Sequence, residues 1–207
     1  MSLKIIKDGS LSKDESALAQ KNYDEIEKKL NNQKYTSFLE ERKRISKLFM
    51  SMKINRPVEE VYNAFLEISL EDLNPNLNPT NFTQDSWYKA SKKNNNNVFK
   101  VQKLVSDKEI CLTWVVKNQL FIKQVRFKSN KLNTKTKIIY FDYAKGDTSI
   151  MGFFERHILN AYLKKQSLAF RVQILKTKLK LKIYKPNKEQ NINKKIDSLL
   201  HYIKNII

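Results

Sequence analysis

The sequence of 207 residues predicts an α+β fold, with an antiparallel sheet of about six strands, a long helix after it and helical additions at both ends. Three observations lead to this prediction. A strand with period-two alternation is followed directly by a helix that opens at a proline. Five runs rich in β-branched and aromatic residues come next, joined by short polar links. A helical period then returns over residues 150–175.

Residues 1–46 are predicted to form a helical arm ahead of the main domain. Ser12 and Glu15 have the spacing of a capping box, and apolar residues then recur among charges over residues 13–31. A second serine–glutamate pair at the same spacing predicts a short helix that ends near residue 46. The arm is rich in charge and thin in apolar residues, so it either packs on the main domain or serves as a partner-binding arm.

A strand and a helix open the main domain. Apolar and polar residues alternate over residues 48–55, which indicates a strand with one buried face. Pro57 and the acids behind it mark the first turn of a helix over residues 58–73. Residues 74–85 hold two prolines and four asparagines and therefore predict a loop.

The sheet continues as a meander and gives way to helices. Residues 176–185 are ambiguous, because alternating lysines suit an edge strand whereas the preceding period favours a fraying helix with a strand close behind. Pro186 then breaks the chain, and a terminal amphipathic helix follows from about residue 192. The predicted strands of the meander are residues 86–91, 98–105, 110–116, 120–128 and 135–144, with the asparagine run before residue 98 as a hairpin tip.

Residues 52–65 combine a strand end, a proline with nearby acids, and a helix with an aromatic residue about a turn and a half in; they read MKINRPVEEVYNAF. With the order of elements, this stretch resembles the START-like (SRPBCC) helix-grip superfamily, and within it an uncharacterised bacterial group. The resemblance covers residues 47–175. It implies a curved sheet wrapped around the long helix, with an apolar cavity for lipids or other hydrophobic ligands. The superfamily does not call for the arm at 1–46 or the basic extension at 176–207.

The net charge of +19 comes from 40 Lys and Arg against 21 Asp and Glu, and only six of the cations are arginine. Most of the excess lies after residue 105. Such an uneven field attracts polyanions, acidic membranes or acidic proteins. The other interpretation is a solvated lysine surface that keeps the protein soluble. The scarcity of arginine argues against a reader of base edges.

Several site classes are excluded by composition. The single cysteine, Cys111, excludes an internal disulfide and a Cys-rich zinc site, and two isolated histidines form no metal motif. Three glycines cannot build a nucleotide-binding loop, and no catalytic triad or carboxylate pair is found. No apolar run approaches the roughly 20 residues of a membrane span. We therefore expect a cytoplasmic protein with no cofactor or metal, and a binding protein rather than an enzyme.

Large aromatic and isolated polar residues on the predicted sheet are the candidates for a ligand cavity, since pockets are mostly apolar with a few polar anchors. The same residues also suit ordinary core or surface positions. The leading interpretation is a non-enzymatic protein with an apolar cavity for a hydrophobic or lipid-like small molecule, of undefined oligomeric state. The cavity candidates are Trp87, Tyr88, Trp114, Gln124, Tyr140 and Asp142.

Lysines after the long helix carry the alternative interpretation. A basic interaction protein would dock on nucleic acid or on an acidic membrane surface through its carboxy-terminal half. No helix-turn-helix, zinc-finger or RNA-recognition signature accompanies these lysines. The candidate anion contacts are Lys176, Lys178, Lys180 and Lys182.

Overall fold

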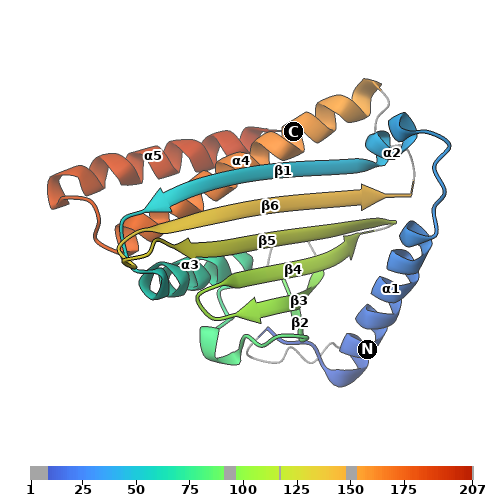
Figure 1. The fold of residues 1–207 in the computed structure, drawn as a ribbon, viewed down its shortest axis with the longest axis horizontal. Coiled ribbons are helices and arrows are strands. Elements are labelled where there is room, and N and C mark those ends of the chain that lie inside the picture. Colours follow the sequence, from blue (N-terminus) through green and yellow to red (C-terminus); the bar gives the residue numbers. More distant parts are fainter. Residues whose placement is uncertain (1–8, 91–96, 117, 148–152, 207) are drawn as a thin grey trace.

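A computed structural model of the chain describes residues 9–90, 97–116, 118–147 and 153–206, without the side chains of residues 39, 42, 43 and 153–159. Its strands are β1 (Ile45–Ile54), β2 (Trp87–Lys89), β3 (Val98–Val105), β4 (Glu109–Val116), β5 (Gln119–Ser129) and β6 (Thr136–Gly146). They form one curved antiparallel sheet in the spatial order β1-β6-β5-β4-β3-β2 (Figure 1). This sheet confirms the predicted α+β class.

The helices of the described residues occupy both faces of the sheet. They are α1 (Lys13–Asn31), α2 (Phe38–Arg44), α3 (Val58–Leu73), α4 (Phe153–Lys180) and α5 (Pro186–Asn205), with a 3-10 turn at Pro79–Asn81. α3 and α4 pack on one face, which we call the inner face, and α1 packs on the opposite, outer face. None of the described helices is long and apolar enough to cross a membrane.

Local signals account for the helix starts that the sequence predicts. The Ser12 hydroxyl accepts the Glu15 amide at 3.2 Å, and the Glu15 carboxylate accepts the Ser12 amide at 3.0 Å, so the predicted capping box is present. α3 has the predicted limits and begins directly after Pro57, with two acids in its first turn.

The lysine-rich segment after residue 175 differs from its expected form. It continues α4 to Lys180, a turn with Lys182 at φ 50° follows, and no strand occurs within residues 181–206. Pro186 is the first residue of α5, not a break, because a proline at that position loses only an amide that would be unpaired. Residues 150–152, which the long helix was expected to include, and residues 94–96 of the hairpin tip lie outside the described residues.

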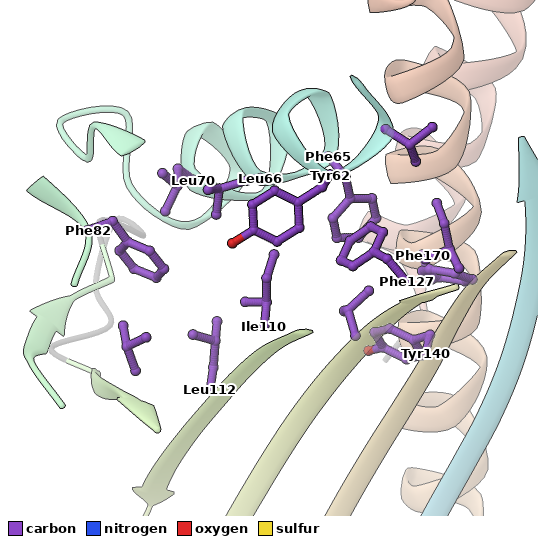
Figure 2. Packing of buried hydrophobic residues seen from close by; sticks show 14 of the residues in the cluster. Tyr62, Phe65, Leu66, Leu70, Phe82, Ile110, Leu112, Phe127, Tyr140 and Phe170 are labelled. Atoms are coloured by element: carbon purple, nitrogen blue, oxygen red, sulfur yellow. The ribbon is translucent and has the colours of Figure 1, made fainter. Parts of the chain in front are cut away.

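The main core lies between the inner face and the two helices on it. Figure 2 shows Tyr62, Phe65 and Leu66 projecting from α3 towards β4 and β5. The ring of Phe65 makes edge contacts with Phe127 of β5 and Phe170 of α4, at centroid distances of 5.6 and 6.5 Å. These rings fill the interior next to α3 with the protein's own side chains.

Candidate functional site

Aromatic and polar side chains gather at the end of the inner face that lies under the first half of α4. We call this group the inner-face site. The strands supply its base and α4 its roof. Its members are Trp114, Phe121, Lys123, Tyr140, Asp142, Tyr162 and Gln166.

Strand register brings the base of the site together. Trp114 of β4 lies opposite Phe121 of β5, and Lys123 of β5 lies opposite Asp142 of β6. Side chains two residues apart on a strand point to the same face, so Tyr140 joins Asp142 on the inner face. The three strands therefore contribute alternate residues to one continuous surface.

Asp142 is the polar centre of the site, with only 2% of its surface exposed. The Tyr140 hydroxyl donates to Oδ2 at 3.0 Å, and the Tyr162 hydroxyl of α4 donates to Oδ1 at 3.2 Å. Burial, and then the negative charge of Asp142, raises the pKa of both tyrosines well above its usual range. Both hydroxyls therefore keep their protons at neutral pH and act as donors.

Lys123 places a cation among the rings. Its Nζ donates to Oε1 of Gln166 at 3.3 Å and lies 5.9 Å from the ring centroids of both Trp114 and Tyr140. Ammonium groups at this distance are attracted by the negative faces of aromatic rings. The site therefore holds the buried carboxyl group of Asp142 and the half-buried ammonium group of Lys123, both in contact with aromatic side chains.

The rings of the site differ in burial. Trp114 stacks on Phe121 with a centroid distance of 5.4 Å and an interplanar angle of 5°, and both rings are half-buried. By contrast, Tyr140 stacks on Phe170 at 4.6 Å and is fully buried. Figure 2 shows the latter pair side by side beneath α4. Trp114 and Phe121 therefore offer more accessible ring surface than Tyr140 and Phe170.

Three of the six cavity candidates meet at this site, and three lie elsewhere. Trp114, Tyr140 and Asp142 meet there. Trp87 and Gln124 point to the outer face, where Trp87 Nε1 donates to Gln20 of α1 at 3.2 Å and Gln124 donates to Glu109. Tyr88 faces inward but from the far edge strand.

Tyr88 belongs to a separate aromatic cluster near β2. Its ring lies 5.1 Å from that of Phe82 and 5.9 Å from that of Phe99. Its hydroxyl donates to the Asn81 carbonyl at 2.7 Å and accepts the Thr83 amide at 2.9 Å. Tyr88 therefore fastens the loop after α3 to the sheet edge.

A polar hollow of about 310 Å³ opens beside the same edge strand. It is shallow and lies on the side of the sheet away from Asp142. Hydroxyls and short polar groups dominate its wall, which differs from the apolar lining that the sequence predicts for a ligand cavity. The lining residues are Ser10, Leu11, Ser16, Asn81, Thr83, Asp85, Ser86, Trp87 and Tyr88.

The carboxy-terminal lysines follow the last turns of α4 and are partly engaged. Lys176 Nζ lies 2.7 Å from the carboxylate of Asp72 on α3, and Lys180 forms an ion pair with Glu67 of the same helix. Lys182 occupies the turn after α4 and is exposed. Two of the four proposed anion contacts therefore also link α4 to α3.

Cys111 is buried on the outer face. Burial, and then the nearby Glu109 charge, raises the pKa of its thiol to about 11, so the thiol stays protonated at neutral pH. Among the residues that the structure describes, no cluster of three or more His, Cys, Asp or Glu side chains is placed to hold a metal ion.

Four members of the inner-face site are absent from the sequence-based candidates. Phe121 and Lys123 lie four and two residues before Val125 on β5, so the alternation of side chains within the strand places all three on the same face, and this alternation is visible in the sequence. Tyr162 stands on the predicted apolar face of the long helix. Their proximity to Asp142 depends on strand register and on the position of α4, which no local pattern shows.

Comparisons with known proteins add fold-level similarity. No family model matches the chain, and no curated protein matches it. Similar solved structures include CalU16 from Micromonospora echinospora (9% identity, 77% of this chain and 88% of that one, TM-score 0.45) and MLL2253 from Mesorhizobium loti (12%, 68% and 99%, 0.48). The Aha1 dimer from Colwellia psychrerythraea is another (15%, 56% and 87%, 0.37). No residue role is carried over from these bacterial proteins.

Proposed function

We propose that the chain is a non-enzymatic binding protein of the START-like type, which holds a hydrophobic or lipid-like small molecule at the inner-face site. The observation that carries the proposal is a buried carboxylate beside a lysine on an otherwise aromatic surface. Ligand sites typically combine a large apolar area with a few fixed polar groups. The resemblance of residues 52–65 to that superfamily supports the same interpretation.

The half-buried rings favour an apolar body on the ligand. Trp114 and Phe121 present a flat stacked surface, and the ring of Tyr162 lies 6.3 Å from that of Phe121. Covering such rings releases water and contributes roughly 25 cal/mol for each Å² of apolar surface buried. The ligand therefore lies along these rings, with its body away from the filled core.

The polar groups favour a ligand with one polar head. Lys123 Nζ donates to Gln166 and, as an ammonium group with three hydrogens, is placed to donate to an anionic or carbonyl oxygen of a ligand as well. Asp142 already accepts two tyrosine hydroxyls and so orients Tyr162 rather than the ligand. We therefore assign the head-group contact to Lys123 and the positioning of the roof to Asp142.

Tryptophan fluorescence tests the proposal because the chain has only two tryptophans, on opposite faces of the sheet. Palmitate is titrated into the full chain, with hexadecylamine as the cationic analogue. We expect palmitate to change the emission of the Trp87→Phe variant, which keeps Trp114. The Trp114→Phe variant, which keeps Trp87, should not respond. Native mass spectrometry of the purified chain then looks for a lipid-like mass that co-purifies.

Lys123→Met provides the matched polar variant, since it keeps the length of the side chain and removes its charge. Weaker binding of palmitate with unchanged binding of hexadecylamine supports the head-group assignment. The proposal fails if neither compound alters Trp114 emission and no bound mass is found. Emission changes of equal size from Trp87 and Trp114 contradict it as well, because they indicate contact at both faces.

A further inference from the structure

A strip of aromatic rings runs across the outer face of the sheet; it is exposed at Phe49 and half-buried at Phe141 and Tyr143. Phe49 of β1 is 67% exposed and lies directly opposite Phe141 of β6. Tyr143 follows on the same face of β6, with its ring centroid 6.3 Å from that of Phe141 and an angle of 22° between the rings. These three rings form one surface that belongs neither to the main core nor to the inner-face site.

Positive charge predominates on the strands that carry the rings, although the charge of Glu41, near α2, lies close enough to Tyr143 to raise its pKa. Side chains that alternate with the inner-face residues point outward, and every charged residue at an outward position of β1, β5 and β6 is a cation. These three strands lie wholly within the described residues. The cations are Lys47, Lys53, Arg126, Lys128, Lys137 and Lys145.

Strand register arranges these cations on both sides of the rings. Lys53 lies opposite Lys137, and Lys137 lies opposite Lys128, so three lysines form a row across three strands. Lys47, opposite Tyr143, stands on the other side of Phe49. At about 3.3 Å per residue, Lys47 and Lys53 are roughly 20 Å apart along β1, so cations stand on both sides of Phe49.

The outer face stays open over the middle of β1, whereas Tyr35 and Glu41, which flank the start of α2, lie near Tyr143 of β6. α1 packs against the part of the sheet that holds Leu120 and Trp87, and in Figure 1 none of the described helices crosses the middle of β1 or β6 on this face. The buried carboxylate of Glu109 borders the area on β4. Burial favours its neutral form, but hydrogen bonds from Lys103 and Gln124 lower the pKa of Glu109, and Lys103 and Arg126 neutralise its charge at 2.8 and 3.8 Å.

We propose that this outer face binds single-stranded nucleic acid without sequence readout. Flat rings offer stacking surfaces to any base, and flanking cations contact the phosphates; together these are the two components of sequence-independent single-strand binding. Phe49 is the stacking residue with the largest free surface, and the lysine rows bind as point charges. Arginine is not needed, because no base edge is read. The site is separate from the carboxy-terminal lysines.

Charge and shape disfavour other occupants. A second copy of this chain would bring two faces of like charge together, which repel. Membrane-surface segments typically insert the apolar side of a helix into the lipid. Here the rings lie in the middle of strands, between lysine side chains that are longer than the rings, which hinders their insertion. A flexible polyanion with exposed bases fits both the rings and the charge.

Fluorescence anisotropy of the full chain with labelled oligouridylate and oligothymidylate, each of about 12 nucleotides, measures the binding. Phe49→Ala should weaken it about tenfold, and Phe49→Leu should weaken it equally, because neither side chain stacks. Phe49→Tyr should keep it. The matched control is Phe38→Ala, which removes a ring that is 74% exposed on α2 and should leave binding unchanged.

Salt titration tests the lysine rows separately. Lys53→Gln with Lys137→Gln should reduce the slope of log affinity against log salt by about 1.4, roughly 0.7 for each phosphate contact of a single strand. Lys188→Gln with Lys194→Gln makes the same change in net charge on exposed positions of α5 and should leave the slope as it is. Binding of either oligonucleotide supports the proposal.

Three results would overturn it. One is the absence of binding to both oligonucleotides at low salt, and another is an equal effect of Phe38→Ala and Phe49→Ala. The third is that the chain binds no oligonucleotide but pellets with vesicles of equal parts phosphatidylserine and phosphatidylcholine, and that Phe49→Ala abolishes this pelleting. That result would assign the outer face to a membrane surface. Each result is independent of the palmitate titration, in which the expected response comes from Trp114 on the inner face.

Discussion

At the residue scale, Asp142 shows how a charged group is kept inside an aromatic surface. Both of its oxygens accept a tyrosine hydroxyl. One donor, Tyr140, lies two residues earlier on β6, and the other, Tyr162, lies on α4. A buried carboxylate without such partners is strongly unfavourable. The same contacts attach the first half of α4 to β6, so Asp142 acts on both stability and the shape of the inner-face site.

Asp142→Asn should lower the free energy of unfolding by about 1–3 kcal/mol. An amide nitrogen replaces one carboxylate oxygen and cannot accept the hydrogen of the tyrosine hydroxyl that donates to that oxygen. Urea titration monitored by circular dichroism measures the loss. Asp197→Asn, at an exposed position of α5, is the control and should change stability by less than about 0.5 kcal/mol. Equal losses in the two variants would mean that the hydroxyl contacts add nothing.

At the element scale, α1 covers one end of the outer face and turns a charge-rich arm into part of the fold. Leu30 is fully buried, and Tyr23 makes an edge contact with Trp87 at a centroid distance of 6.1 Å. The arm therefore packs on the sheet, which is one of the two roles that the sequence leaves open. The coverage by α1 stops before β1 and β6, and that limit leaves Phe49 exposed.

Ser12→Ala removes the first half of the capping box of α1 and should destabilise the chain by about 1 kcal/mol, since the Glu15 amide loses its acceptor. Thermal unfolding followed at 222 nm in circular dichroism detects the shift. Ser198→Ala, an exposed change in the middle of α5, should not lower the midpoint. If both variants melt with the parent chain, the cap makes no net contribution.

Gly9 fastens the start of the described chain to the edge of β2. Its φ is +77°, and its carbonyl accepts the Lys89 amide at 2.9 Å. A Cβ there would lie 2.8 Å from Asn74 Nδ2, so Gly9→Ala combines backbone strain with a clash and should cost about 1–3 kcal/mol. Hydrogen exchange should show faster exchange of the Leu11 and Lys89 amides. Unchanged protection of both amides would contradict this role.

At the scale of the whole molecule, buried tyrosines make stability depend on alkaline pH. Burial raises the pKa of Tyr23 to about 12 and also raises the pKa values of Tyr62 and Tyr162. Each folded-state pKa exceeds that of the unfolded chain, so the folded state holds protons that the unfolded state releases above about pH 10. The stabilisation is complete below that pH and is lost as pH rises through the folded-state values.

Urea unfolding at a series of pH values from about 8 to 12 should therefore show a steady fall in stability that begins near pH 10. Tyr162→Phe should reduce the steepness of the fall, because one fewer proton is released on unfolding. The test is the slope within this range, compared with the parent chain. A slope that is the same in the variant and the parent would show that Tyr162 does not titrate on unfolding.

Much of the fold is local and therefore visible in the sequence. α3 and β3 have the predicted limits, because Pro57 and the asparagine run mark their starts unambiguously. The end of α4 and the start of α5 are not visible in this way. Alternating lysines suit a strand and a helix equally, and Pro186 can end one helix or begin another.

The sites depend on a different kind of information. Trp87 and Tyr88 are adjacent on one strand, so at most one of them can face inward. This alternation alone excludes one of the two from a cavity on the inner face. The approach of Lys123 to Asp142, and of Phe49 to Phe141, depends on which residues of separate strands lie opposite each other. Such register is set by the packing of the whole sheet, and no short segment encodes it.

The pairing of β1 with β6 has a consequence for the order in which the chain folds. Ile45 pairs with Lys145, so β1 leaves the ribosome long before β6, its strand partner among the described residues, which follows roughly a hundred residues later. β3 to β6 form a meander of short loops and are able to assemble among themselves first. Until β6 is available the backbone edge of β1 stays without this partner, and we expect the docking of β1 to be the last step in the assembly of the sheet.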